Sequence, residues 1–194
     1  MASKSMSSSS FSIPTKSWRY DVFLSFRGED TRHNFVDHLY NALDQKRIHV
    51  FKDDKELSLG KQISPELLQA IEESRFAVVI LSKRYADSSW CLDELAKIME
   101  CQDQMGQKVL PVFYHVDPSD VRGQKRDFAT AFEQHEFKGE MDKVNNWRKA
   151  LTTTANLPVS WHISADSGLV LSPFVDEFIS KLNLLWRVIK VYQP

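Results

Sequence analysis

Hydrophobic positions along the chain follow two periods, and the two periods alternate. Short apolar runs predict buried strands, whereas apolar residues that recur every three or four positions predict amphipathic helices. The expected strands are residues 20–26, 48–51, 76–81, 109–114 and 159–163. The expected helices are residues 30–46, a segment that begins at 64–66, and residues 90–104, 127–136, 141–157 and 173–192. Strands that alternate with helices indicate an α/β domain with a parallel sheet.

Five such strands in a chain of 194 residues predict a flavodoxin-like sheet. Residues 76–81 (FAVVIL) form the most apolar run and are expected at the centre of the sheet. Pro111 lacks a backbone N–H, so we expect it at an edge or a bulge. Ligands of such sheets bind beyond the carboxyl ends of the strands, which makes the following loops candidates. They are residues 25–32, 52–60 and 82–90, whereas residues 115–123 are expected to be an ordinary turn-rich loop.

Composition narrows the class of protein. The formal net charge is -1, which argues against a dedicated nucleic-acid-binding domain. No run reaches the roughly 18 apolar residues of a transmembrane helix, so no membrane partner is expected. Residues 1–17 are rich in serine, and the first acidic residue is Asp21. We interpret this segment as a disordered leader, with an organelle transit peptide as the alternative.

Cysteine and histidine spacing excludes two kinds of site. Cys91 and Cys101 fall in one predicted helix, about 15 Å apart along its axis. A disulfide needs Cα atoms within about 7 Å, so the two cannot pair within the chain, which favours a reducing compartment. His33 and His38 are five residues apart and do not share a helix face, so no metal site is expected. Glycine-rich nucleotide motifs and the GxSxG hydrolase motif do not occur in the sequence.

Trp90 and Glu94 form the strongest candidate for chemistry. They are four residues apart, so on a helix they lie on the same face. An aromatic plane beside a carboxylate could hold a heterocycle and an electron-poor sugar carbon. The alternative is that Trp90 covers the core and Glu94 stabilises the start of the helix, and spacing alone favours this alternative. Asp93 is the better candidate for an ordinary first-turn acid.

Arg27, Gly28 and Arg32 form a second candidate site, after the first strand. Gly28 allows close approach of the backbone, and a helix that begins just after it would point N–H groups at an anion. The two arginines could pair with phosphate in bidentate fashion. The alternative, favoured by spacing alone, is an ordinary strand-to-helix turn with surface arginines.

Four long stretches together resemble the Toll/interleukin-1 receptor (TIR) domain family, specifically its plant immune-receptor branch. In chain order they are YDVFLSFRGEDTRHNFVDHLYNAL, FKDDKELSLGKQISPELLQAIEESR, FAVVILSKRYADSSWCLDELAKI and VLPVFYHVDPSDVRGQ, which cover roughly residues 20–157. Several long motifs in family order are a more specific signal than one short pattern. The resemblance implies the TIR fold, a flavodoxin-like five-stranded parallel sheet flanked by helices.

The resemblance also implies an NAD+ nucleosidase that cleaves the nicotinamide–ribose bond and makes nucleotide signals for plant immune signalling. NADP+ is a second candidate substrate, and no permanently bound cofactor is expected. The family's catalytic glutamate, in the motif WCLxEL, corresponds to Glu94. Asp53 falls in the loop after the second strand, which in this family helps to close the site between protomers. The implied substrate-binding residues are Arg27, Gly28, Arg32, Asp53, Ser88 and Trp90.

Members of the family self-associate, and their activity depends on it. One contact surface uses the first helix, often through a Ser-His pair, where this chain has Asp37 and His38. Asp37 would repel its copy across a symmetric contact unless a nearby cation neutralises its charge. The expected partners are a second copy of the chain and other TIR-domain proteins.

A second stretch departs from the family pattern. The family often reads QTGSFG where this chain has QKRDFA, so that Lys125, Arg126 and Asp127 replace other residues and two glycines are lost. Together with Asp37, this change supports the alternative function, which is a non-catalytic TIR adaptor or a decoy that binds other TIR domains.

The expected organisation has three parts: a leader at residues 1–17, a TIR domain at residues 18–165 and a helical extension at residues 166–194. The extension either packs on its own domain or forms a contact for a partner. No sequence of a nucleotide-binding or leucine-rich-repeat domain accompanies these parts. A TIR-only protein, a truncated product and an isolated domain therefore stay open. We expect a cytoplasmic location, and a nuclear location in addition to it stays open.

Overall fold

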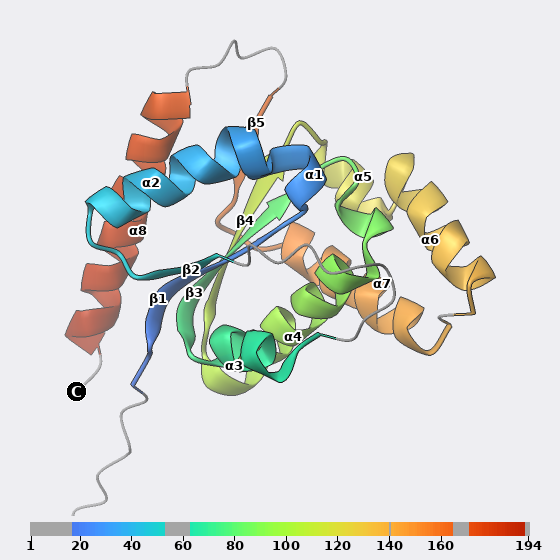
Figure 1. The fold of residues 1–194 in the computed structure, drawn as a ribbon, viewed down its shortest axis with the longest axis horizontal. Coiled ribbons are helices and arrows are strands. Elements are labelled where there is room, and N and C mark those ends of the chain that lie inside the picture. The colour runs from blue at the N-terminus through green and yellow to red at the C-terminus, as the bar shows by residue number, and fades with distance from the viewer. Residues whose placement is uncertain (1–16, 53–62, 140, 165–170, 193–194) are drawn as a thin grey trace, which may run out of the picture.

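A five-stranded parallel sheet forms the centre of the molecule (Figure 1). It is seen in a computed structural model, in which residues 17–52, 63–139, 141–164 and 171–192 are described. The strands are β1 (Tyr20–Phe26), β2 (Val50–Lys52), β3 (Ser74–Leu81), β4 (Lys108–Tyr114) and β5 (Trp161–Ile163). Their order, β2-β1-β3-β4-β5, confirms the flavodoxin-like winding expected from the sequence.

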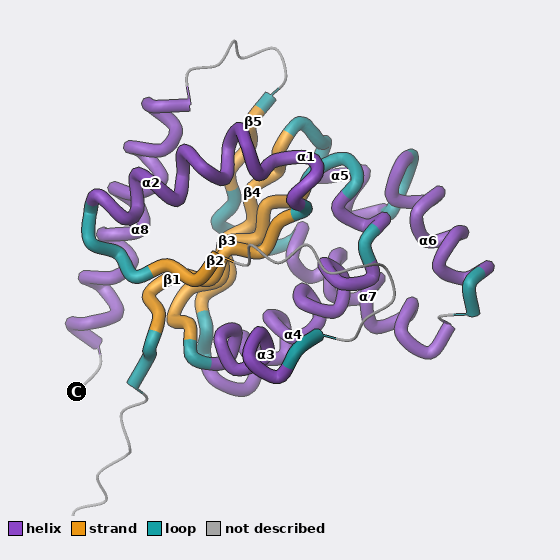
Figure 2. Tube along the Cα trace, in the orientation of Figure 1, coloured by secondary structure: helices purple, strands orange, loops and turns teal. Residues whose placement is uncertain are grey.

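Helices cover both faces of the sheet, as Figure 2 shows. One face is covered by α2 (Asp37–Gln45) and α8 (Leu171–Tyr192), and the other by α3 (Pro65–Glu72), α4 (Ser89–Met105) and α7 (Met141–Ala155). The other helical segments are α1 (Gly28–Thr31), a π-helical segment (Arg32–Val36), a 3₁₀ turn (Tyr85–Asp87), α5 (Pro118–Gly123) and α6 (Asp127–Phe137). The two helical layers explain why residues 76–81 of β3 are apolar on both faces of the sheet.

The strand β3 lies in the middle of the sheet, as its apolar sequence predicts. Its side chains point alternately to the two faces. Phe76, Val78 and Ile80 belong to the core beneath α2 and α8. Ala77, Val79 and Leu81 belong to the core beneath α3, α4 and α7. β3 therefore contributes to both cores, and its carboxyl end leads into a candidate loop.

The first helix differs from the prediction for residues 30–46. The helical path begins at Gly28 and passes through the π-helical segment before α2 ends at Gln45. Most other boundaries of the predicted elements agree with the structure to within two residues. The helix start predicted at Ser64 is confirmed, because Ser64 Oγ accepts a hydrogen bond from the backbone N–H of Leu67 at 3.3 Å.

The prediction of a turn-rich loop at residues 115–123 was wrong, because most of this segment forms the helix α5. The Asp117 carboxylate accepts a hydrogen bond from the backbone N–H of Ser119 at 2.7 Å, and Pro118 takes the first helical position. Aspartate and proline favour both turns and helix starts, so their presence alone did not distinguish the two.

Pro111 does not lie on an edge strand, contrary to expectation. It is part of β4, where it is the register partner of Val79 in β3. The ladder between β4 and β5 begins only at Val112. Pro111 therefore precedes the part of β4 that pairs with β5. No partner strand needs its missing N–H on that side, which explains why proline is tolerated here.

The last helix packs on its own domain. Val175, Phe178, Ile179 and Leu182 are buried in the core that α8 shares with α2, and the Phe178 ring lies 4.8 Å from that of Trp161. The first of the two alternatives for this segment therefore holds for the described part of α8. Among the described residues, no helix combines the length and apolarity needed to cross a membrane.

Arg126 has a backbone conformation that favours glycine. Its φ and ψ angles are 52° and -122°, a combination that a residue with a side chain rarely adopts. Its side chain is 80% exposed and lies 3.3 Å from the Asp120 carboxylate. An exposed ion pair contributes little to stability, so backbone strain is the larger effect here.

We therefore expect Arg126→Gly to raise the free energy of unfolding by about 1 kcal/mol, since relief of strain exceeds the entropy cost of a new glycine. Lys125→Gly is the matched control, because Lys125 is not among the described residues with positive φ. That variant should lower stability. Urea unfolding of both variants measures the difference, and a less stable Arg126→Gly protein would contradict the strain argument.

Candidate functional site

Side chains from three parts of the chain meet at the carboxyl ends of β1 and β3. Ser25 lies near the end of β1, Tyr85 lies in the 3₁₀ turn after β3, and Glu94 lies in the second turn of α4. Ser25 and Tyr85 are fully buried, and Glu94 is only 3% exposed. A carboxylate thus lies inside the protein at the sheet edge where ligands of such folds bind.

Both oxygens of Glu94 accept hydrogen bonds. Trp90 Nε1 donates to Oε1 at 2.7 Å, and Ser25 Oγ donates to Oε2 at 2.8 Å. The first bond joins residues one helical turn apart and confirms that Trp90 and Glu94 share a helix face. The second bond crosses from α4 to β1, so the position of the carboxylate depends on the tertiary fold.

The Ser25 hydroxyl also contacts Tyr85. Its Oγ lies 2.9 Å from the Tyr85 hydroxyl, whose single proton can go either to Ser25 Oγ or to the backbone carbonyl of Cys91, 3.0 Å away. Burial raises the pKa of Tyr85 well above its ordinary value, and the nearby Cys91 and Glu94 act in the same direction. Tyr85 therefore keeps its proton.

Arg27 is held by acids from its own loop. Its Nη2 donates to Glu29 Oε2 at 2.6 Å, and its Nε lies 3.9 Å from Asp30 Oδ1. Arg84 also approaches Glu29 Oε2, with its Nη1 at 3.3 Å. Two guanidinium groups from two loops therefore converge on one carboxylate.

Asp30 connects the segment after β1 to the loop after β3 through hydrogen bonds. Its Oδ2 accepts hydrogen bonds from Ser82 Oγ at 2.6 Å and from the backbone N–H of Arg84 at 3.1 Å. Gly28 begins α1, whose first turn carries the acids Glu29 and Asp30. Negative charge in that turn disfavours an anion at the same helix start. The binding role expected for Gly28 stays a prediction.

Ser88 and Arg32 have local roles in this structure. Ser88 is the N-cap of α4, and its Oγ accepts a hydrogen bond from the backbone N–H of Cys91 at 3.3 Å. Arg32 lies in the π-helical segment, with its Cζ 5.5 Å from the centre of the Phe26 ring. Asp53 lies outside the described residues.

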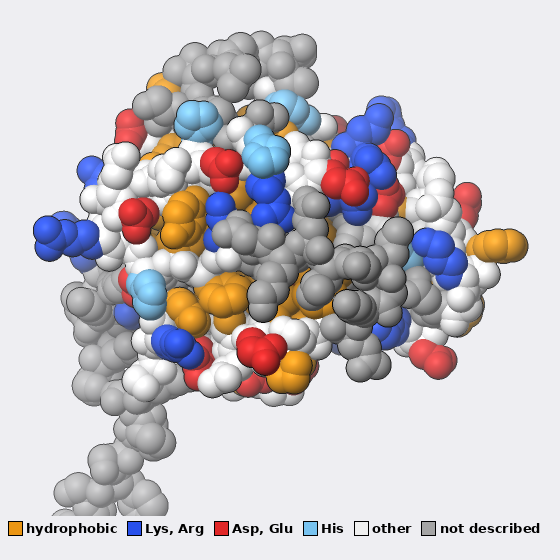
Figure 3. Space-filling model, viewed as in Figure 1, with side chains coloured by type: hydrophobic (Ala, Val, Ile, Leu, Met, Phe, Trp, Pro, Cys, Tyr) orange, Lys and Arg blue, Asp and Glu red, His pale blue; other side chains and the backbone are white. Residues whose placement is uncertain are grey.

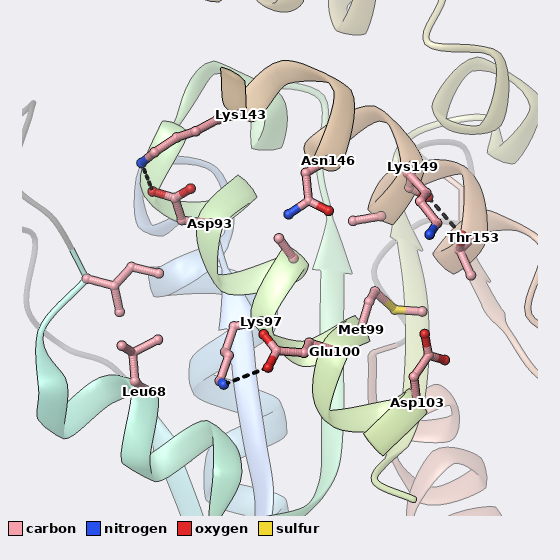
Figure 4. Close-up of a pocket in the computed structure, with 13 residues that line it drawn as sticks. Leu68, Asp93, Lys97, Met99, Glu100, Asp103, Lys143, Asn146, Lys149 and Thr153 are labelled. Atoms are coloured by element: carbon pink, nitrogen blue, oxygen red, sulfur yellow. Dashed lines mark hydrogen bonds and ion pairs between the residues drawn. The ribbon is translucent and has the colours of Figure 1, made fainter. Parts of the chain in front are cut away.

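A cavity of about 570 Å³ lies between α3, α4 and α7 (Figure 4). Ion pairs line its walls, with Lys143 Nζ 2.7 Å from Asp93 and Lys97 Nζ 3.3 Å from Glu100. Glu94 does not line it, so the cavity lies on another face of α4. Asp93 also accepts a hydrogen bond from Trp147 Nε1 at 2.9 Å, which joins α4 to α7.

Charge is mixed on the surface. Positive and negative side chains lie interspersed on the face seen in Figure 3, in keeping with the formal net charge of -1. Within the described parts of the chain, no three His, Cys, Asp or Glu residues are grouped so that they could hold a metal ion.

Comparison with known proteins assigns the family. The model of the TIR domain matches residues 19–182. This chain belongs to the TIR domain family. Disease resistance protein RPV1 of Vitis rotundifolia is 57% identical over 162 residues, which are 84% of this chain and 11% of that protein. TMV resistance protein N of Nicotiana glutinosa is 55% identical over 168 residues, which are 85% of this chain and 15% of that protein. The chain thus spans only a small part of the length of these relatives.

Solved TIR structures share the fold. The TIR domains of the activated Roq1 resistosome have a TM-score of 0.75 and 50% sequence identity, and the match covers 84% of this chain and 98% of that chain. The heterodimer of the RPS4 and RRS1 TIR domains has a TM-score of 0.50 at 22% identity, with 84% and 95% covered. The second similarity supports the fold alone.

In this TIR domain, the charge of Asp37 on α2 is partly neutralised by side chains of the same chain. Lys52 Nζ lies 3.1 Å from Asp37 Oδ1 and 4.8 Å from the centre of the Tyr40 ring. His33 Nδ1 lies 3.8 Å from the other carboxylate oxygen, and His38 is exposed. The repulsion expected between two copies of Asp37 is therefore reduced by Lys52, the last residue of β2.

Sequence reasoning did not single out Ser25, Tyr85 or Arg84 in this TIR domain. Ser25 lies within a candidate loop range, but serine at the end of a strand is common, and its partner is 69 residues away. Tyr85 and Arg84 lie in the loop after β3 without any periodic pattern. Only the pairing of β1 with β3 brings these residues to Glu94 and Arg27.

Both cysteines of the TIR domain are free and buried. Burial raises the pKa of Cys91 to about 12, and the charge of Glu94 adds to this effect. Because the thiolate is the reactive form, we expect almost no reaction of the native protein with a thiol reagent at about pH 8. Both thiols should react after unfolding in guanidinium chloride. Fast reaction of one thiol in the native protein would contradict the buried position.

Proposed function

We propose that this TIR domain hydrolyses NAD+ at the nicotinamide–ribose bond, with NADP+ as a second candidate substrate. The observation that carries the proposal is the buried Glu94 carboxylate, fixed by Trp90 and Ser25 at the edge of the sheet. The same residue occupies the position of the catalytic glutamate in the family motif WCLxEL.

One carboxylate is sufficient for this reaction. Glycosidases need a second acid to protonate the leaving oxygen, whereas nicotinamide leaves from a pyridinium cation as a neutral molecule. The C1′–N bond breaks with both electrons on nitrogen, and water then adds to the ribose carbon and releases a proton. Glu94 would stabilise the positive charge that develops on the ribose.

The arginines near Glu29 are suited to the diphosphate of the substrate. Arg27 and Arg84 already share the Glu29 carboxylate. A phosphate group of NAD+ would replace Glu29 between them, because guanidinium groups bind phosphate and carboxylate with the same geometry. The Trp90 ring offers a surface for a base of the dinucleotide.

We further propose that activity depends on self-association through the surface of α2 that carries Asp37 and His38. One relative that this chain resembles is named a disease resistance protein and another a TMV resistance protein, and a similar TIR domain comes from an activated resistosome. A role in plant immune signalling, with contacts to other TIR domains, follows from these likenesses. A cytoplasmic or nuclear location would suit such a role.

A non-catalytic adaptor is the second candidate. Both oxygens of Glu94 are already hydrogen-bonded within the protein, and the side chain is 3% exposed. A carboxylate that is buried and hydrogen-bonded in this way can have a purely structural role, in which it joins α4 to β1. An adaptor or a decoy would keep the fold and the association surface without turning over NAD+.

We expect Glu94→Gln to lower nicotinamide release by about 100-fold or more, because the amide keeps the shape but loses the charge that stabilises the transition state. Glu100→Gln is the matched control, since it changes an exposed glutamate of the same helix. Chromatography of the products from both variants and wild type measures the rates. Equal rates for Glu94→Gln and wild type would exclude the hydrolase and leave the adaptor.

The ion pair of Lys52 with Asp37 should support self-association. We expect Lys52→Ala to raise the dissociation constant of the dimer by up to about fivefold, the equivalent of about 1 kcal/mol for one partly buried ion pair. The double variant Asp37→Asn and Lys52→Ala should restore it, because no uncompensated charge remains. Sedimentation at rising concentration measures both. Failure of the double variant to recover would contradict the charge argument.

A further inference from the structure

A chain of buried hydroxyl groups leads away from Glu94. Ser25 Oγ donates to Glu94 Oε2 at 2.8 Å, and the Tyr85 hydroxyl lies 2.9 Å from the same Ser25 Oγ. Ser25 and Tyr85 are both 0% exposed. The hydroxyls therefore act on the carboxylate in a medium of low polarity, where hydrogen bonds are stronger than in water.

Tyr85 can donate its proton in either of two directions. Its hydroxyl lies 2.9 Å from Ser25 Oγ and 3.0 Å from the backbone carbonyl of Cys91. When Tyr85 donates to Ser25, the Ser25 hydroxyl is polarised and becomes a better donor to Glu94. The high pKa of Tyr85 keeps this proton in place.

The two donors to Glu94 have different mechanical roles. Trp90 lies on the same helix, so it moves with Glu94. Ser25 belongs to β1 and Tyr85 to the turn after β3, and both strands are paired at the centre of the sheet. The hydroxyl chain therefore fixes the carboxylate relative to the loops that would hold the dinucleotide.

We infer that Ser25 and Tyr85 are positioning residues for Glu94, which hold its carboxylate against the ribose of the substrate. This inference rests on the proposed function. Neither residue would touch the substrate, since Ser25 acts on Glu94 directly and Tyr85 acts through Ser25. Besides Glu94, the ionisable side chain that acts on the Tyr85 hydroxyl is Cys91, on α4.

Removal of single hydroxyl groups from the full chain tests the inference. Ser25→Ala should lower kcat for nicotinamide release by about 10- to 100-fold, the usual effect of a misplaced catalytic group. Tyr85→Phe should lower kcat by about fivefold, the equivalent of one neutral hydrogen bond. KM should change by less than about twofold in both, because the nucleotide contacts remain. The double variant should be no slower than Ser25→Ala, since Tyr85 acts through Ser25.

Ser74→Ala is the matched control. Ser74 is equally buried, but it lies at the amino end of β3, where its Oγ donates to the carbonyl of Ala70 at 2.6 Å. Its loss can reduce stability without touching Glu94, so kcat should stay at the wild-type value. Unfolding midpoints of all variants show whether each is folded at the assay temperature. Wild-type kcat in a folded Ser25→Ala protein would overturn the inference while the hydrolase stands.

A second readout does not need activity. The indole Nε1–H of Trp90 donates to Glu94, and its NMR signal can be assigned among the five tryptophans by its absence in Trp90→Phe. The chemical shift of that signal should change in Ser25→Ala and Tyr85→Phe and should be unchanged in Ser74→Ala. If wild-type protein releases no nicotinamide, the proposed function fails. In that case an unmoved signal overturns the positioning role, and a moved signal supports it.

Discussion

The buried carboxylate of Glu94 is the constraint on which the rest of the site depends. A charged group that is 3% exposed must be hydrogen-bonded, because its transfer from water is otherwise very costly. Trp90 and Ser25 each satisfy one oxygen. The second bond requires that β1, β3 and α4 keep their relative positions, so the sheet and the site stabilise one another. Loss of one donor would leave a buried acceptor unsatisfied.

Much of the fold could be predicted because its signals are local. The apolar run of β3 and the helical spacing of Trp90 and Glu94 are visible within a few residues of sequence, and both agree with the structure. The helix α5 was missed for the opposite reason, since Asp117 and Pro118 favour turns and helix starts alike. Pro111 was placed at an edge because the sequence does not show how short β5 is.

The remaining parts of the site depend on contacts that are distant in sequence. Ser25 and Glu94 are 69 residues apart, and Asp30 and Ser82 are 52 residues apart. No period or motif pairs such residues, since the register of β1 with β3 decides which ones meet. The same holds at α2. The sequence shows the charge of Asp37, but it does not show that the Lys52 side chain forms an ion pair with it.

The catalytic role of Glu94 is tested most directly by a crystal structure of the full chain with a carbocyclic analogue of NAD+, which cannot be cleaved. If Glu94 is the catalytic carboxylate, the ring that replaces the nicotinamide ribose lies against Glu94, and the diphosphate lies beside Arg27. An analogue bound only in the cavity between α3, α4 and α7 would contradict the assignment of Glu94 as the catalytic carboxylate. Absence of the analogue from crystals soaked to saturation would contradict it as well.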